Sequence, residues 1–178
     1  MRFYRVSGTY EGDFFDGEFQ PYPDLDALFL SSVIPHDSCI SIASGSRPGD
    51  IISSSFNVVS ERFLAALEVC GATGFTAIPV KVVHGGTSIP GYSIIKLLGR
   101  GGAFDEERSE ADRQGSALFG YSGIYMDERQ WDGSDVFAIP GLGIGMFVTE
   151  KVKESLERAR LSGVEIVLNS ECRFGSHA

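Results

Sequence analysis

Two stretches of the chain carry the same order of polar and apolar positions, 89 residues apart. They cover residues 59–75 and 148–164. Each contains a hydroxyl residue followed by glutamate, Ser60 or Thr149, and then apolar residues at helical spacing. A hydroxyl at this place can accept a bond from a free backbone N–H of the first turn, and the positive end of the helix dipole favours the glutamate. The pattern predicts two helices that begin directly after these hydroxyl residues.

A glycine and a strand-like run follow each predicted helix. We expect the helices to end near Gly71 and Gly163, because glycine readily adopts the backbone conformation of a helix C-terminus. Residues 75–83 and 164–168 are rich in apolar and β-branched side chains and predict strands. Two readings stay open: an internal strand–helix–strand duplication, or two capped helices whose sequences coincide by chance.

The duplicated pattern also has a common lead-in. Asp50 and Asp135 are each followed by two apolar residues and precede the hydroxyl residue of their own stretch by 10 and 14 positions. The lead-in therefore extends the similarity of the two stretches towards their N-termini.

Further strands are expected over residues 1–6, 92–98 and 118–126. The second of these should pair antiparallel with 75–83, because the intervening residues 84–91 are typical of a hairpin connection. Loops too short for regular crossover helices favour an α+β fold with a mainly antiparallel sheet. We expect both principal helices to pack on one face of that sheet.

The length of 178 residues fits a single domain over residues 1–178. Residues 171–178 are expected to be a mobile tail. The chain has no apolar run near the roughly 20 residues that a membrane span requires, and its start lacks the apolar stretch of a signal peptide. We therefore expect a cytoplasmic protein that does not bind membranes.

Residues able to carry catalysis or bind a metal are few. The three histidines do not form a ligand pair, and the three cysteines are too far apart in sequence for a zinc knuckle, so neither a metal nor another cofactor is predicted. His84, beside two glycines, is the best single candidate for a general base. The chain is expected not to be an enzyme; the alternative is a small enzyme of unknown class that uses His84 or a carboxylate of the cluster at residues 105–112.

The negative charge is concentrated in one segment. Residues 101–135 hold nine acidic and three basic side chains, which is −6 of the total −9. Such a charge makes nucleic acid an improbable partner and favours a basic protein. The segment is either an ordinary solvated face or a surface that steers and anchors a partner. For the second reading the candidate residues are Asp105, Glu106, Glu107, Glu110, Asp112, Tyr121, Tyr125, Asp127, Glu128, Trp131 and Asp132.

The same stretches resemble the Immunity protein 11 family of bacterial polymorphic-toxin systems. The resemblance is carried by residues 56–82, by Asp105 and Ser109, and by segments 135–137 and 147–164. It covers roughly residues 50–168, whereas residues 1–49 are much less diagnostic.

The resemblance implies a cytoplasmic protein that binds and neutralises a cognate toxin or effector domain. The family brings no catalytic residues. Some relatives carry paired Cys-x-x-Cys-Gly motifs that suggest zinc, and this sequence has none. The acidic segment would suit a basic effector such as a nuclease. Neither the identity of the toxin nor the oligomeric state follows from the sequence.

Overall fold

The computed structural model describes residues 1–178 with the exception of 10, 22–37, 115–116, 143–144 and 176–178. The described residues form two α-helices, α2 (Glu61–Val69) and α3 (Glu150–Arg158), and a 3₁₀ turn, η1 (Glu128–Gln130). The strands are β1 (Phe3–Gly8), β2 (Asp16–Gln20), β3 (Cys39–Ser44), β4 (Ile51–Ile52), β5 (Val58–Ser60), β6 (Phe75–Pro79), β7 (Lys81–His84), β8 (Thr87–Ile89), β9 (Tyr92–Leu97), β10 (Gly99–Arg100), β11 (Glu110–Gln114), β12 (Ala117–Ser122), β13 (Val136–Ala138), β14 (Met146–Thr149), β15 (Val164–Leu168) and β16 (Arg173–Gly175).

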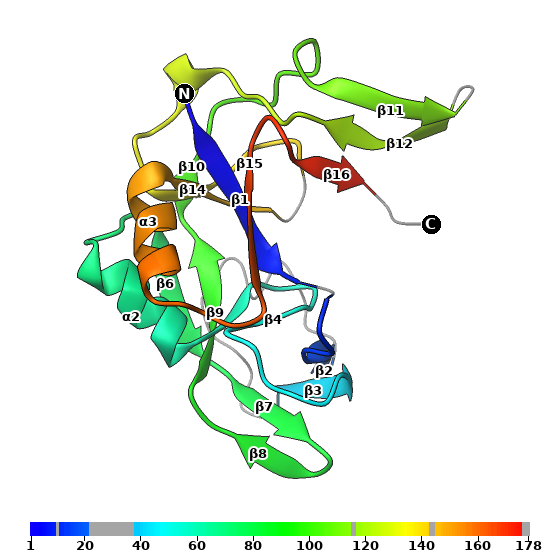
Figure 1. Cartoon of the computed structure of the whole chain (residues 1–178), viewed down its shortest axis with the longest axis vertical. Coiled ribbons are helices and arrows are strands. Elements are labelled where there is room, and N and C mark those ends of the chain that lie inside the picture. The colour runs from blue at the N-terminus through cyan, green and yellow to red at the C-terminus, as the bar shows by residue number, and fades with distance from the viewer. Residues whose placement is uncertain (10, 22–37, 115–116, 143–144, 176–178) are drawn as a thin grey trace.

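The strands are distributed over two central and two peripheral sheets (Figure 1). The central sheets have the orders β4-β5-β9-β6 and β10-β13-β14-β1-β15, and the peripheral sheets have the orders β2-β3-β7-β8 and β11-β12-β16. Among the described strands, only the pairs β3–β7 and β10–β13 are parallel. The predicted α+β class with mainly antiparallel pairing is confirmed, although the strands form several sheets rather than one.

The two central sheets repeat each other. We call β4, β5, α2, β6 and β9 the first repeat unit, and β13, β14, α3, β15 and β1 the second. Equivalent strand pairs keep the same register: Ile51↔Val59 and Val136↔Val148, Ser60↔Tyr92 and Thr149↔Phe3, Pro79↔Ser93 and Leu168↔Tyr4. The sequence repeat is therefore also a structural repeat, and β1 at the start of the chain completes the second unit in the place that β9 holds in the first.

The helices begin where the sequence predicts, but only one ends there. The Ser60 hydroxyl caps α2 by accepting a hydrogen bond of 3.2 Å from the backbone N–H of Phe63. The chain then turns at Gly71, whose φ is +60°. In contrast, α3 ends at Arg158, and Arg160 takes the left-handed conformation with φ +48°. The prediction that α3 extends to near Gly163 is therefore wrong.

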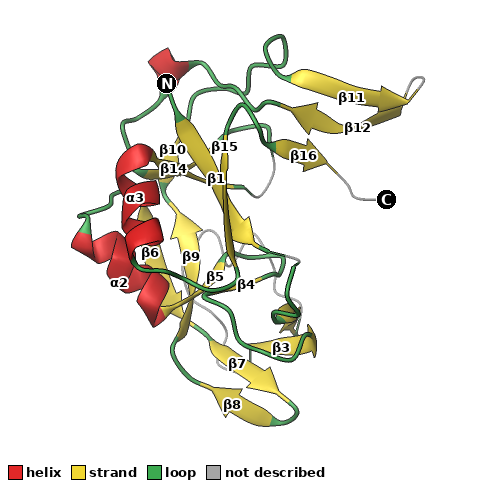
Figure 2. Ribbon diagram, in the orientation of Figure 1, coloured by secondary structure: helices red, strands yellow, loops and turns green. Residues whose placement is uncertain are grey.

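Both helices pack together on one side of the molecule, as predicted (Figure 2). They meet at Ala66 and Ser155, which are themselves 89 residues apart, and the Ser155 hydroxyl donates a 2.7 Å hydrogen bond to the carbonyl oxygen of Ala66. Small side chains at this point allow the two helices to approach closely. Beneath them lies one apolar core cluster that both helices and both central sheets share, including Tyr4, Val59, Phe63, Leu67, Val148 and Leu156.

Four predictions for strands, a loop and the tail differ from the structure. The strand expected over 118–126 is β12, which ends at Ser122. Residues 75–83 divide into β6, which pairs antiparallel with β9 as expected, and β7, which belongs to a peripheral sheet. The expected hairpin loop 84–91 contains a strand of its own, β8. Part of the expected tail 171–178 forms β16, which pairs with β12.

Candidate partner-binding surface

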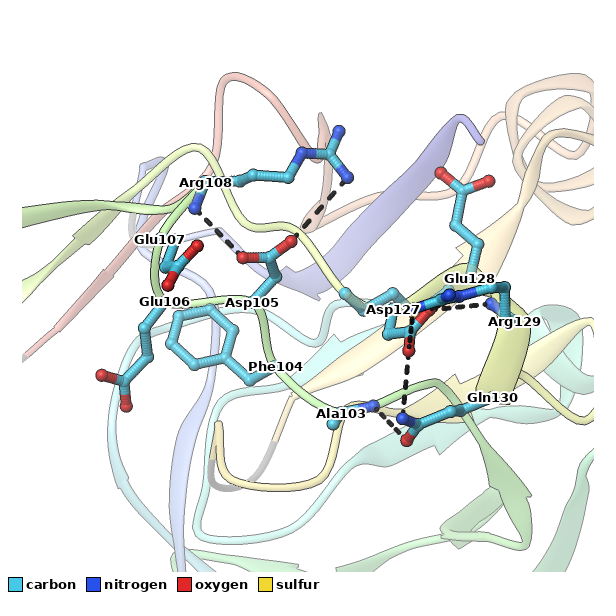
Figure 3. A pocket seen from close by; sticks show the side chains of 11 residues that line it. Ala103, Phe104, Asp105, Glu106, Glu107, Arg108, Asp127, Glu128, Arg129 and Gln130 are labelled. Atoms are coloured by element: carbon cyan, nitrogen blue, oxygen red, sulfur yellow. Dashed lines mark hydrogen bonds and ion pairs between the residues drawn. The ribbon is translucent and has the colours of Figure 1, made fainter.

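A broad, open hollow of about 590 Å³ lies where two segments of the acidic region meet, residues 103–108 and 126–130 (Figure 3). We call it the acidic hollow. Backbone hydrogen bonds join its two walls: Asp105 N–H donates to Tyr125 O at 3.0 Å, and Asp127 N–H donates to Ala103 O at 2.9 Å. Its side chains include five carboxylates and two guanidinium groups: Asp105, Glu106, Glu107, Asp127, Glu128, Arg108 and Arg129.

Two of these carboxylates form hydrogen bonds that stabilise the walls of the hollow. Asp105 accepts a 3.1 Å hydrogen bond from the backbone N–H of Arg108. Asp127 accepts bonds from the backbone and side chain of Arg129 and from the side chain of Gln130. The bonds from Arg129 hold the pKa of Asp127 below its usual value. Both aspartates therefore shape the hollow, and Asp127 stays ionised at neutral pH.

The glutamates of the hollow are more exposed. Glu106 and Glu107 are exposed and make no ion pair within the described part of the chain (Figure 3). Glu128, on the opposite wall, pairs with the amino group of Met1. Glu106 and Glu107 are therefore the carboxylates of this surface most available to another molecule.

The hairpin β11–β12 extends the acidic surface beyond the hollow. Glu110 and Asp112 are exposed on β11. Tyr121 packs edge-on against Phe104 with a centroid separation of 4.8 Å, and the Tyr125 ring lies 4.6 Å from the Arg108 guanidinium carbon. The two tyrosines thus connect the hairpin and the hollow.

The structure places Trp131 and Asp132 in structural roles. The Trp131 ring is partly buried against Phe137, and its Nε1–H donates to Ser134 O at 3.2 Å. Asp132 accepts 2.8 and 2.9 Å bonds from the backbone N–H groups of Arg100 and Ser134. Partial burial opposes ionisation of Asp132, but these bonds outweigh it and lower the pKa. The polar groups of these two side chains are therefore engaged within the protein, although Asp132 itself is exposed.

Among the described residues, the structure does not bring His84 together with the carboxylates of the cluster at residues 105–112. His84 is exposed on the hairpin β7–β8, and its ring lies 4.9 Å from that of Phe15; no carboxylate is among its contacts in the described structure. The described residues also contain no group of three or more histidine, cysteine or acidic side chains arranged to hold a metal ion. None of the helices in the described segments is long and apolar enough to cross a membrane.

Sequence reasoning missed the most highly connected carboxylates. Asp50 is only 3% exposed and accepts hydrogen bonds from Ser60, Arg62 and Ser162. Asp135 accepts the equivalent bonds in the second repeat unit. The common lead-in of the two stretches was the signal, but a sequence does not reveal that each aspartate reaches across to the other unit.

Comparison with known proteins agrees with the resemblance in the sequence. A search of curated proteins found no match. The model of an immunity protein family, Imm11, matches residues 32–167, which is more than half of the chain. The match covers the first repeat unit, most of the second and the acidic hollow between them. The chain therefore belongs to the Immunity protein family Imm11.

Proposed function

We propose that this protein binds and neutralises one cognate toxin domain in the cytoplasm, and that the acidic hollow and the hairpin β11–β12 form the binding surface. Family membership supports an immunity role against a toxin. The observation that carries the proposed surface is the pair of exposed, unpaired carboxylates of Glu106 and Glu107 beside a concave wall.

The partner best suited to this surface is a basic protein, such as a nuclease domain. The substrate cleft of a nuclease must be cationic to hold phosphates. An immunity protein with a complementary potential can be steered to that cleft over a distance of about one Debye length, and it can then occlude the cleft. Tyr121 and Tyr125 would supply the apolar contacts that steering alone does not provide.

The proposal is tested by co-expression with the candidate toxin encoded beside the gene for this protein. A catalytically inactivated toxin should co-purify with the immunity protein, and the active toxin should be harmless only when the immunity protein is present. A toxin from an unrelated system serves as the control for specificity. Failure of the neighbouring product both to co-purify and to lose toxicity would contradict the proposed function.

A further inference from the structure

Two aspartates hold the repeat units together in a reciprocal manner. In the first unit, Asp50 binds the hydroxyl of Ser60, at the start of its own helix, at 2.6 Å. It also binds Ser162, in the turn after the helix of the other unit, through the backbone N–H at 2.7 Å and the hydroxyl at 3.1 Å. A guanidinium nitrogen of Arg62 completes the set at 3.0 Å.

Asp135 makes the equivalent contacts from the second unit. It binds the hydroxyl of Thr149 at the start of α3 and the ammonium group of Lys151 at 3.1 and 2.8 Å. Thr73, in the turn after α2, donates from its backbone N–H and its hydroxyl, each at 3.1 Å. All three of these partners stand 89 residues from their counterparts Ser60, Arg62 and Ser162.

Only the Asp135 contacts adjoin the two chain segments that lead into the walls of the acidic hollow, 98–102 and 131–135. The segment of the wall at 126–130 continues through Ser134 to Asp135, and the next residue, Val136, donates its N–H to Thr73 O at 2.9 Å. The segment that leads into the other wall begins at Leu98 and Gly99, whose N–H groups both donate to Gly74 O at 2.8 and 2.7 Å. The segments that lead into the two walls therefore both bond to one two-residue turn.

The turn requires a glycine. Gly74 has φ +92°, and a Cβ atom there would lie 2.2 Å from Val136 O. The close approach of these segments thus requires glycine at this position. The Asp135 carboxylate holds the turn against the second unit, together with the bond from Val136 N–H to Thr73 O.

We propose that Asp135 is the positioning residue of the acidic hollow: by holding the turn Thr73–Gly74, it fixes both walls in the orientation that presents Glu106 and Glu107. Its consequence for toxin binding rests on the proposed function, but the positioning is a property of the free protein. Asp50 is the matched control, because it makes the same contacts in the other unit without a wall of the hollow attached to it.

Hydrogen exchange of the free, full-length protein tests the positioning. Asp135→Asn should raise exchange of the amides in 98–106 and 126–136 on the order of tenfold, equivalent to the loss of about one hydrogen bond, and Asp135→Glu should recover part of the protection. Asp50→Asn should leave those of these amides that exchange by local opening within about twofold of the wild type, because its larger loss of global stability acts only on amides that exchange by global unfolding. The milder pair Thr73→Ala and Ser162→Ala repeats the comparison if an aspartate variant does not fold.

Equal exchange in the two variants of either pair would overturn the positioning role, whether or not a toxin has been found. In the complex with an inactivated toxin, Asp135→Asn should increase the dissociation rate and leave association nearly unchanged, because the charge of the exposed glutamates is retained. Unaltered exchange together with normal toxin binding would leave the proposed function standing and remove this inference alone.

Discussion

At the scale of single residues, Asp50 and Asp135 make equivalent hydrogen bonds but are buried to different extents. The side chain of Asp50 is 4% exposed and that of Asp135 is 14% exposed. Hydrogen bonds to a carboxylate are strong, and their loss is most costly where water cannot replace them. The Asp50 contacts should therefore contribute more to stability than those of Asp135.

Replacement of each aspartate by asparagine measures this difference. Asp50→Asn should lower the free energy of unfolding by about 2–3 kcal/mol, and Asp135→Asn by about 1 kcal/mol. Urea denaturation followed by circular dichroism gives both values, with Asp112→Asn, an exposed residue on β11, as the control. Equal losses at positions 50 and 135 would contradict the ranking by burial.

The Asp135 contribution should also depend on pH. Burial alone would raise its pKa, but hydrogen bonds from Lys151, Thr73 and Thr149 outweigh burial and hold the pKa below the ordinary value of 3.8. A depressed pKa in the folded state gives stability that is fully present above the unfolded value and is lost as the pH falls through the folded value. The difference in unfolding free energy between wild type and Asp135→Asn should therefore shrink below about pH 4. A difference that is constant from pH 7 to pH 3 would show that ionisation of Asp135 is unimportant.

At the scale of elements, the crossing of α2 and α3 is the contact on which the two repeat units meet. Ala66 is 6% exposed at this crossing, whereas the adjacent Ala65 is on the exposed face of α2. Side chains larger than alanine or serine would force the helices apart and disturb the core cluster beneath them.

A larger side chain should destabilise the protein at position 66, between the helices, but not at the neighbouring position 65. Ala66→Leu should lower the free energy of unfolding by about 1–3 kcal/mol, because the extra atoms have no space between the helices. Ala65→Leu adds the same atoms to solvent and should change stability by less than about 0.5 kcal/mol. Thermal or urea unfolding compares the two variants, and similar effects at both positions would argue against close packing of α2 on α3.

The elements also show where sequence patterns predict structure and where they do not. The starts of both helices follow from Ser60 and Thr149, because capping is a local effect. Thr149 nevertheless makes no side-chain cap bond, and its hydroxyl donates to Asp135. The apolar run 75–83 gives no sign of the break between β6 and β7, because that break depends on which sheet each half joins.

At the scale of the whole molecule, the two repeat units are not continuous in the sequence, because β1 at the start of the chain belongs to the second unit. The sequence repeat predicts two related strand–helix–strand segments, but not that β1 completes the second one, because pairing between distant strands leaves no local pattern. Composition likewise locates the acidic segment but does not separate its roles. The side chains of Asp127, Trp131 and Asp132 form hydrogen bonds within turns, whereas those of Glu106 and Glu107 make no ion pair with the described residues, and only the folded structure reveals that distinction.

The most direct test of the proposed binding surface is therefore the rate at which the protein associates with its inactivated cognate toxin. The informative variant is Glu106→Lys with Glu107→Lys, measured by stopped-flow at several salt concentrations. Its control is Glu18→Lys with Glu68→Lys, which changes the net charge equally at exposed positions on β2 and α2. The surface predicts that the first pair slows association on the order of tenfold at low salt and weakens its salt dependence, while the control has a much smaller effect. Equal association rates for the two double variants would contradict binding through the acidic hollow.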